Sequence, residues 1–127
     1  MSNIIDINKG KKVETIPSYE VAKMMGKEHW EVLRMLEGYE PPKGSKSRKV
    51  VGIIPTLNHH NIVVVEYFIL SAYVDAKGEN RKCYECTKMG CEMLANKMTG
   101  EKGILFTAKY VKRFNEMESA QMQTIDT

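Results

Sequence analysis

The chain has 127 residues, of which 43% are hydrophobic and 28% are charged, and its 19 Lys and Arg residues against 16 Asp and Glu residues leave a formal net charge of +3. This length suits one domain with a modest core and is too short for two ordinary domains, while the apolar fraction argues against wholesale disorder. The sequence lacks a run of about eighteen apolar residues, so we expect no membrane-spanning helix.

Residues 1–16 are expected to form an N-terminal arm or short strands. Ile5 and Ile7 alternate with polar residues, and the pair Lys9 and Gly10 is typical of a turn. A basic segment followed by an apolar run, the mark of a secretory signal, is missing here. We therefore expect the protein in a cytoplasm, where its three cysteines stay thiols.

Residues 17–39 predict two helices joined by a tight turn. Ser18 is of a type that caps helices, and Gly26 can adopt left-handed backbone geometry without steric cost, so it can end the first helix. The second helix is expected from about residue 28 to residue 37. Apolar residues recur at helical spacing on both sides of the turn: Val21, Ala22, Met25, Trp30, Leu33 and Leu36.

Residues 40–60 carry loop signals, because Pro41 and Pro42 are followed by a run of lysine, arginine, serine and glycine. Within this segment only residues 50–54 indicate order, as a short strand. A connection of this length inside a compact domain is unusual, and such loops are commonly functional or mobile.

Residues 62–74 are rich in β-branched and aromatic side chains, so they predict a strand. A turn at residues 75–80, with Gly78 near its middle, leads to a returning strand at residues 81–87. The sequence therefore predicts a β-hairpin with an extended tip.

The last part of the chain predicts two helices. Thr87 is placed to cap a helix that runs to about Met98, and Thr99 and Gly100 end it. A long amphipathic helix then follows over residues 101–119, before a frayed tail or linker stub over residues 120–127. The apolar sets are Met89, Met93, Leu94 and Met98 on the first helix, and Ile104, Ala108, Val111, Phe114 and Met117 on the second.

A basic hairpin behind a helix-turn-helix is the layout of a winged helix, in which the second helix enters the major groove and the hairpin grips the DNA backbone or minor groove. His29 could instead cap the core. Two simpler interpretations also stay open, namely helices that only pack and a charged turn that only keeps the surface soluble. The candidate DNA-binding residues are Lys27, His29, Trp30 and Arg34 on the second helix, and Lys77, Asn80, Arg81 and Lys82 at the hairpin tip.

Cys83 and Cys86 have the spacing of a zinc knuckle or a redox pair, and Cys91 and the pair His59 and His60 could add ligands. Zinc sites usually need two such pairs, and residues three apart in a strand point to opposite faces. We therefore expect buried thiols, with no metal, no cofactor and no catalytic residues. The common catalytic and phosphate-binding motifs do not occur in this sequence, which argues against an enzyme.

Residues 21–34 (VAKMMGKEHWEVLR) resemble the signature VAxxxGKxHxxVLR of the phage regulatory Rha proteins. Residues 67–118 are similar, in the same order, to the family's downstream run FxxSxYxDxxG…YxxTxxG…TGxKAxxFKxxYIxxFNxME. Two separated signatures are more specific than either alone. By position, Gly26, Lys27, His29 and Arg34 match the helix-turn-helix signature, and Asp75 and Gly78 match the hairpin turn.

The resemblance implies a phage or prophage regulator or antirepressor in the bacterial host cytoplasm, with a winged-helix-like DNA-binding module at its N-terminus. Family members often carry a further C-terminal domain. The chain departs from the family pattern at Cys83, where the family often has proline, and at Cys86, where it often has leucine. The loop at residues 41–61 is also longer and more basic than the family pattern.

These observations predict an α+β fold that is winged-helix-like, with a helix-turn-helix followed by a β-hairpin and two C-terminal helices in one domain over residues 17–119. The first hypothesis is a non-enzymatic phage regulator that binds double-stranded DNA to control transcription, with a homodimer through the last helix doubling the site. The second is an antirepressor-type adaptor that binds a repressor protein without contacting DNA. The modest charge and the acidic Glu28 and Glu31 on the predicted recognition helix favour the second.

Overall fold

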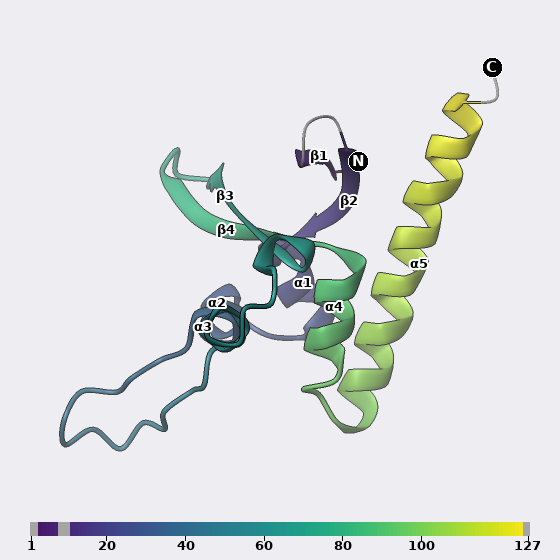
Figure 1. Ribbon diagram of the computed structural model, residues 1–127. Coiled ribbons are helices and arrows are strands. Elements are labelled where there is room, and N and C mark those ends of the chain that lie inside the picture. The colour runs from purple at the N-terminus through teal and green to yellow at the C-terminus, as the bar shows by residue number, and fades with distance from the viewer. Residues whose placement is uncertain (1–2, 8–10, 126–127) are drawn as a thin grey trace.

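The computed structural model describes the backbone of residues 3–7 and 11–125 and the side chains of residues 13–120 (Figure 1). The chain begins with an antiparallel hairpin of β1 (Asn3–Ile7) and β2 (Lys11–Pro17). Its register pairs Asn3 with Thr15 and Ile7 with Lys11. Of the two alternatives for this segment, the structure therefore has the short strands.

Two helices follow directly, α1 (Ser18–Met25) and α2 (His29–Glu37). Gly26 lies between them with a φ of 71°, and its N–H donates to the carbonyl oxygens of Ala22 and Lys23, which confirms that a left-handed glycine ends α1. The predicted cap at Ser18 is wrong. Pro17 holds the cap position, and the Ser18 side chain is buried and bonded elsewhere.

The segment after α2 contains a helix that the sequence analysis missed, α3 (Ile53–His59). The predicted strand at residues 50–54 is wrong, because only Val50 pairs, in an isolated bridge with Tyr39. Pro55 lies in the first turn of α3, where backbone N–H groups have no partner within the helix, so a proline is tolerated there. The loop between Tyr39 and Val50 has no regular structure.

The main hairpin consists of β3 (Phe68–Val74) and β4 (Asn80–Cys86), which pair in register from Phe68 with Cys86 to Val74 with Asn80. The strand predicted at residues 62–74 is therefore too long at its start, where the chain forms a short 3-10 turn, η1 (Val64–Glu66). The strand order is β1-β2-β4-β3, and β2 joins β4 only through Ile16 and Pro17.

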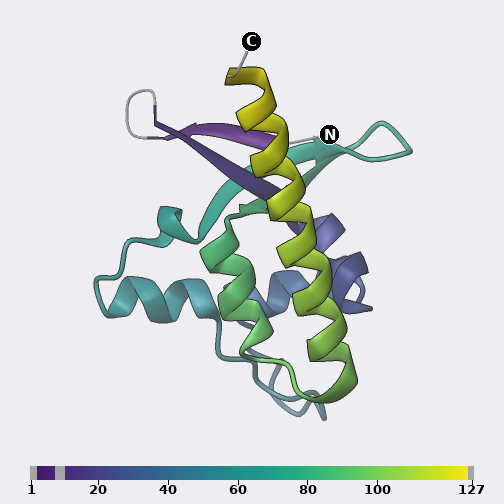
Figure 2. The ribbon, with the colours of Figure 1, turned by 90° about the vertical axis from the view of Figure 1, so that its right-hand side faces the viewer.

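The two C-terminal helices are α4 (Lys88–Ala95) and α5 (Gly100–Ile125). The Thr87 side chain accepts a hydrogen bond from the Gly90 N–H, which confirms the predicted cap. The α5 helix extends beyond residue 119, so residues 120–125 are helical rather than frayed. Figure 2 shows α4 and α5 side by side, with α5 continuing past the β1–β2 hairpin.

The predicted apolar faces of these helices are partly wrong. Ile104 is 71% exposed and Ala108 is also exposed, whereas Phe106 is fully buried. Met89 likewise faces solvent, and its neighbours Gly90 and Cys91 pack inward. The inward stripe of α5 thus consists of Phe106, Tyr110, Phe114 and Met117.

One core joins all layers of this mixed α and β fold, because α1 packs against α2, α5 and β4, while α4 packs against α5. The described part of the chain holds five α-helices and an antiparallel sheet, and none of its helices is both long and apolar enough to cross a membrane. The largest fully buried apolar side chains are Ile16, Val21, Met25, Val32, Leu36, Phe68, Leu94 and Phe106.

Two glycines inside helices should respond to alanine with opposite signs. A Cβ on Gly90 would collide with the Tyr67 carbonyl oxygen and lie 2.9 Å from the Phe68 ring, so Gly90→Ala should lower the free energy of unfolding by about 1–3 kcal/mol. A Cβ on Gly103 meets only Met98, at 3.4 Å, so Gly103→Ala should raise it by about 0.5–1 kcal/mol. Denaturant unfolding followed by circular dichroism measures both, and a stable Gly90→Ala protein would contradict this close approach of α4.

Candidate nucleic-acid interface

The α2 helix has one buried face and one outward face. Val32 and Leu36 are fully buried, whereas Trp30 on the other face is 54% exposed. In Figure 1, α2 and the β3–β4 hairpin lie on the left, away from α5 on the right. The structure therefore brings the two groups of predicted site residues to one side of the molecule.

A buried hydroxyl fixes the start of α2. Ser18 Oγ accepts a hydrogen bond from the Tyr84 N–H at 2.9 Å and lies 2.8 Å from Nε2 of His29. Since the hydroxyl already accepts from Tyr84, its own proton can go to a neutral imidazole nitrogen. Burial lowers the pKa of His29 and so favours that neutral form. His29 thus positions α2 against α1 and β4.

An aromatic cluster joins the same place to the hairpin. The rings of Tyr19 and Tyr73 are 4.5 Å apart, and the His29 ring meets both nearly edge-on, at centroid distances of 6.2 and 6.0 Å. Tyr73 belongs to β3, close to the hairpin tip. The orientation of the hairpin is therefore coupled to the first residue of α2.

Arg34 is held between two aromatic rings on the outward side of α2. Its guanidinium carbon lies 4.8 Å from the centroid of the Trp30 ring and 3.7 Å from that of Tyr39. Such cation–π stacking orients the plane of the guanidinium and leaves its N–H donors along the edge. The edge of the guanidinium is thus oriented to donate hydrogen bonds to an anion or to a planar hydrogen-bond acceptor.

The C-terminal end of α2 is anchored to β4 through Glu37. Its carboxylate oxygen Oε2 pairs with the Lys82 ammonium at 2.6 Å and accepts a hydrogen bond from the Tyr84 hydroxyl at 2.8 Å. Burial and this bond raise the pKa of Tyr84 to about 12. Lys82 therefore lies in an intramolecular ion pair, and its contact with DNA stays a prediction.

Asp75 organises the hairpin tip, which we define as residues 75–82. Its carboxylate accepts from the backbone N–H groups of Lys77 and Glu79, at 2.9 Å each, and from Nε of Arg81 at 2.8 Å. The bond from Arg81 is the main reason that the pKa of Asp75 is lowered. Arg81 also pairs with Glu79 at 3.1 Å, so this predicted DNA ligand is engaged within the hairpin.

The remaining predicted site residues differ in exposure. Lys77 and Asn80 at the tip are exposed, and Lys27 is half-buried in the turn between α1 and α2. Glu37 and Tyr39 also lie beside the site, although they were not among the predicted site residues. The contact of Glu37 with Tyr84 has no local signal in the sequence, because the two residues are 47 positions apart.

All three cysteines are buried thiols. Burial raises the pKa of Cys91 to about 12 and raises that of Cys86 well above its usual range, so neither is a ready thiolate. Among the residues that the structure describes, no three His, Cys, Asp or Glu side chains lie close enough to hold a metal ion. The geometry gives no support to the zinc or redox hypothesis.

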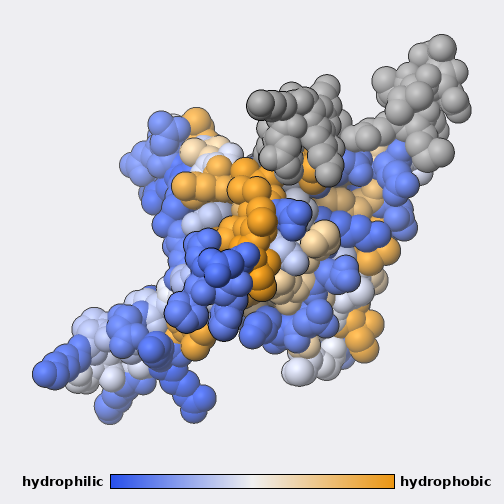
Figure 3. Space-filling view, in the orientation of Figure 1, coloured by the Kyte–Doolittle hydropathy of each residue, from blue (hydrophilic) through white to orange (hydrophobic). Residues whose placement is uncertain are grey.

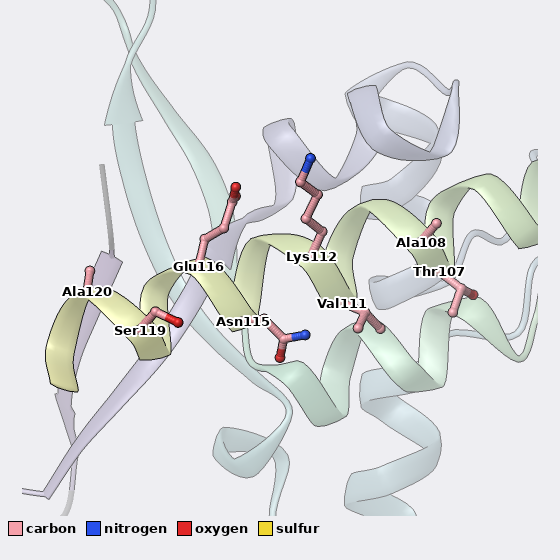
Figure 4. A pocket seen from close by; sticks show the side chains of 8 residues that line it. All are labelled: Thr107, Ala108, Val111, Lys112, Asn115, Glu116, Ser119 and Ala120. Atoms are coloured by element: carbon pink, nitrogen blue, oxygen red, sulfur yellow. The ribbon is translucent and has the colours of Figure 1, made fainter. Parts of the chain in front are cut away.

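A hollow of about 720 Å³ runs along the outer face of α5 (Figure 4). Among the described side chains, those that line it all come from this one helix, and neither a histidine nor a cysteine is among them. Within the described part of the chain, the hollow therefore brings together no groups from different elements, as a catalytic site does. The outward side of α2 with the hairpin tip is the better candidate site.

Comparisons with known proteins identify the family of the chain. The family model described as phage regulatory protein Rha matches residues 16–119. The chain is 43% identical over 105 residues to the SPbeta prophage-derived putative antirepressor protein YoqD of Bacillus subtilis (strain 168). That alignment covers 83% of this chain and 36% of the relative, so the chain spans about a third of the relative's length. No solved structure gives a significant match.

The contact between Ser18 and His29 predicts a pH-dependent stability. The pKa of His29 is lower in the folded protein than in the unfolded chain, so the unfolded chain binds more protons just below pH 6.5. The free energy of unfolding therefore decreases there as the pH decreases. Wild-type protein should therefore lose stability relative to His29→Gln as the pH falls from 7.5 to 5, by at most about 1.4 kcal/mol per pH unit.

Denaturant unfolding of both proteins at each pH measures this difference. Glu85 has a pKa raised by burial and so acts in the opposite direction in acid, but it is present in both proteins and cancels in the comparison. If the free energies of unfolding of the two proteins change in parallel with pH, protonation of His29 is not coupled to unfolding, and the prediction is wrong.

The three thiols should react slowly in the folded protein. Their burial and raised pKa values predict that a thiol reagent such as dithionitrobenzoate labels all three cysteines at once in denaturant and at least about tenfold more slowly without it. Absorbance at neutral pH follows the reaction. Rapid labelling of a single cysteine in the native protein would restore the redox hypothesis.

Proposed function

The chain belongs to the phage regulatory protein Rha family, and from that premise we propose that it binds double-stranded DNA as a winged helix and so controls phage or prophage transcription. The family and the antirepressor relative give the chain a phage regulatory role. The observation that carries the DNA-binding proposal is the common side of α2 and the hairpin tip (Figure 1).

The order of the elements supports a winged-helix arrangement. A strand, β2, directly precedes α1 and α2, and the hairpin of β3 and β4 follows them. The sheet order β2-β4-β3 places that first strand beside the returning strand of the hairpin. In this arrangement α2 is the recognition helix, and the hairpin tip is the wing.

The outward residues of α2 fit a groove-facing role. Trp30 and Arg34 are four residues apart in α2 and so share one side of it, and Lys27 lies in the turn just before the helix. Arg34, oriented by its two aromatic neighbours, is suited to a bidentate contact with a guanine edge or a phosphate. His29 acts as a positioning residue, because its Nε2 faces Ser18.

The wing would add backbone contacts. Lys77 and Asn80 are exposed at its tip, and Arg81 and Lys82 pair with acidic residues of this chain through contacts that are half-open to solvent. Because the Arg81 and Lys82 side chains are themselves about half exposed, a DNA phosphate can compete with the carboxylate for each of them. The wing thus supplies contacts that fix the register of α2 on the duplex.

A second function, binding of a repressor protein, has one observation in its favour. Leu70 and Val74 are each 65% exposed, and Ile62 and Val63 are 43% and 56% exposed. Figure 3 shows an apolar strip in the middle of the face it displays. Exposed apolar patches are typical of protein interaction sites, and the relative named above is described as an antirepressor.

A salt titration separates the two functions. Fluorescence anisotropy with labelled duplexes from the phage's own early region should show affinity that falls log-linearly with salt. Arg34→Ala and Lys27→Ala should each weaken binding about tenfold or more, and Lys77→Ala and Arg81→Ala should each reduce the salt slope by about 1.

The control is Lys109→Ala, because this exposed lysine lies on α5, away from α2. It should bind as the wild type does. If the wild type and all these variants bind the duplexes equally poorly, with no salt dependence, the protein-binding function takes precedence.

A further inference from the structure

The positive charge of the chain is concentrated in one loop. Residues 40–49 contain Lys43, Lys46, Arg48 and Lys49 against the single acid Glu40. This excess equals the formal net charge of the whole chain, +3, so the remainder holds as many acidic as basic residues. We call residues 40–49 the basic loop.

The base of the basic loop is fixed. Tyr39 and Val50 exchange two backbone hydrogen bonds of 2.9 Å each, which bring the two ends of the loop together. Beside them, a Cβ on Gly52 would lie 2.5 Å from the Gly38 nitrogen, so only glycine allows the two segments to come so close. The loop therefore projects from a defined point, rather than hanging from a loose tether.

That point is continuous with the outward side of α2. Gly38 ends α2, and the next residue, Tyr39, both closes the loop and stacks on Arg34. In Figure 1 the loop extends to the lower left of α2 and the hairpin to the upper left. The candidate recognition helix thus lies between two projecting elements.

The loop cations are more open than those of the hairpin. All residues from Pro42 to Lys49 are exposed, and among the described side chains the loop has a single ion pair, an exposed contact of 3.6 Å between Lys49 and Glu40. Arg81 and Lys82, in contrast, pair with acids at 2.8 and 2.6 Å. Figure 3 shows the loop as a hydrophilic projection.

We propose that the basic loop is a second DNA-backbone contact, which binds phosphates beyond the stretch covered by α2, on the side away from the wing. The proposal rests on the DNA binding proposed above. Lys43, Lys46 and Arg48 are the contacting residues, and Lys49 keeps its pair with Glu40. A polyanion is the partner that fits, because beyond the two prolines at its start the loop offers only cations, serine hydroxyls and a glycine.

The length of the loop limits its reach. Ten residues that leave and return to one base extend outward by at most about five residues, or roughly 16 Å at 3.3 Å per residue. Since phosphates along one strand are spaced by about 3.4 Å of helix axis, the loop can lengthen the contacted stretch by about five base pairs. The added contacts carry no sequence information of their own.

The test compares two triple variants on a 40-base-pair duplex of arbitrary sequence. One is Lys43→Gln, Lys46→Gln and Arg48→Gln in the loop, and the matched control is Lys102→Gln, Lys109→Gln and Lys112→Gln on α5. The loop variant should lower the slope of log affinity against log salt by about 2–3 and weaken binding about tenfold to a hundredfold at 50 mM salt. The control removes the same charge and should change the slope by less than about 1.

Hydroxyl-radical footprinting on a duplex that the protein binds at one position gives a second measurement. The loop variant should lose protection over about five base pairs at one end of the footprint. Equal melting temperatures of the three proteins show that the substitutions, all at exposed positions, leave the fold intact.

The outcomes separate the two proposals. If the loop variant keeps the wild-type slope while Arg34→Ala weakens binding, the loop proposal is wrong and DNA binding by α2 stands. If both triple variants lose affinity and salt slope equally, net charge alone explains the effect and the loop proposal is also wrong. If the wild type shows no salt-dependent binding to any duplex, both proposals fail.

Discussion

The arrangement of the candidate site depends on one buried hydroxyl group. Ser18 opens α1, yet its side chain bonds to the backbone of β4 and to the first residue of α2, so it connects three elements in a place where water cannot replace it. A buried donor or acceptor left without a partner costs about 1–3 kcal/mol, which makes this connection selective for one geometry. The edge-on contacts of His29 with Tyr19 and Tyr73 extend the same constraint to β3. The helix and the hairpin are therefore positioned together.

The hairpin tip balances two requirements, a defined shape and a charged surface. Asp75 supplies the shape, because one carboxylate accepts two backbone N–H groups and the Arg81 side chain. These bonds also neutralise Arg81 while no other anion is present. Among the described side chains, only Lys49 of the basic loop cations pairs with an acid, and the two ends of the loop are joined at its base by Tyr39 and Val50. On the proposed DNA binding, the defined shape of the hairpin is suited to fixing the position of α2 along the duplex. The loop is suited to adding electrostatic attraction to phosphates without fixing that position.

Local signals in the sequence predicted local features of the fold. Gly26, the cap at Thr87 and the tip around Gly78 each depend on a few neighbouring residues, and the structure has all three. The role of Ser18 could not be predicted, because its partner Tyr84 is 66 positions away. The predicted apolar stripe of α5 was partly wrong for a similar reason: this helix carries apolar residues on two sides, and the positions of α4 and α1 decide which side is buried. The common placement of helix and hairpin tip followed from the motif order, but the pairing of Arg81 and Lys82 did not.

The acidic residues of α2 now have a structural explanation. Glu28 and Glu31 seemed to weaken the case for DNA binding, yet each carboxylate accepts a backbone N–H of the other at the start of the helix. Acids at a helix N-terminus also interact favourably with the helix dipole, so the partial positive charge of that terminus compensates part of their negative charge. Their presence therefore reflects the need to start a helix two residues after a tight turn. The α2 helix itself carries little net charge, so the DNA binding proposed above depends on a neighbouring element for attraction to phosphates, and the basic loop begins shortly after α2 ends.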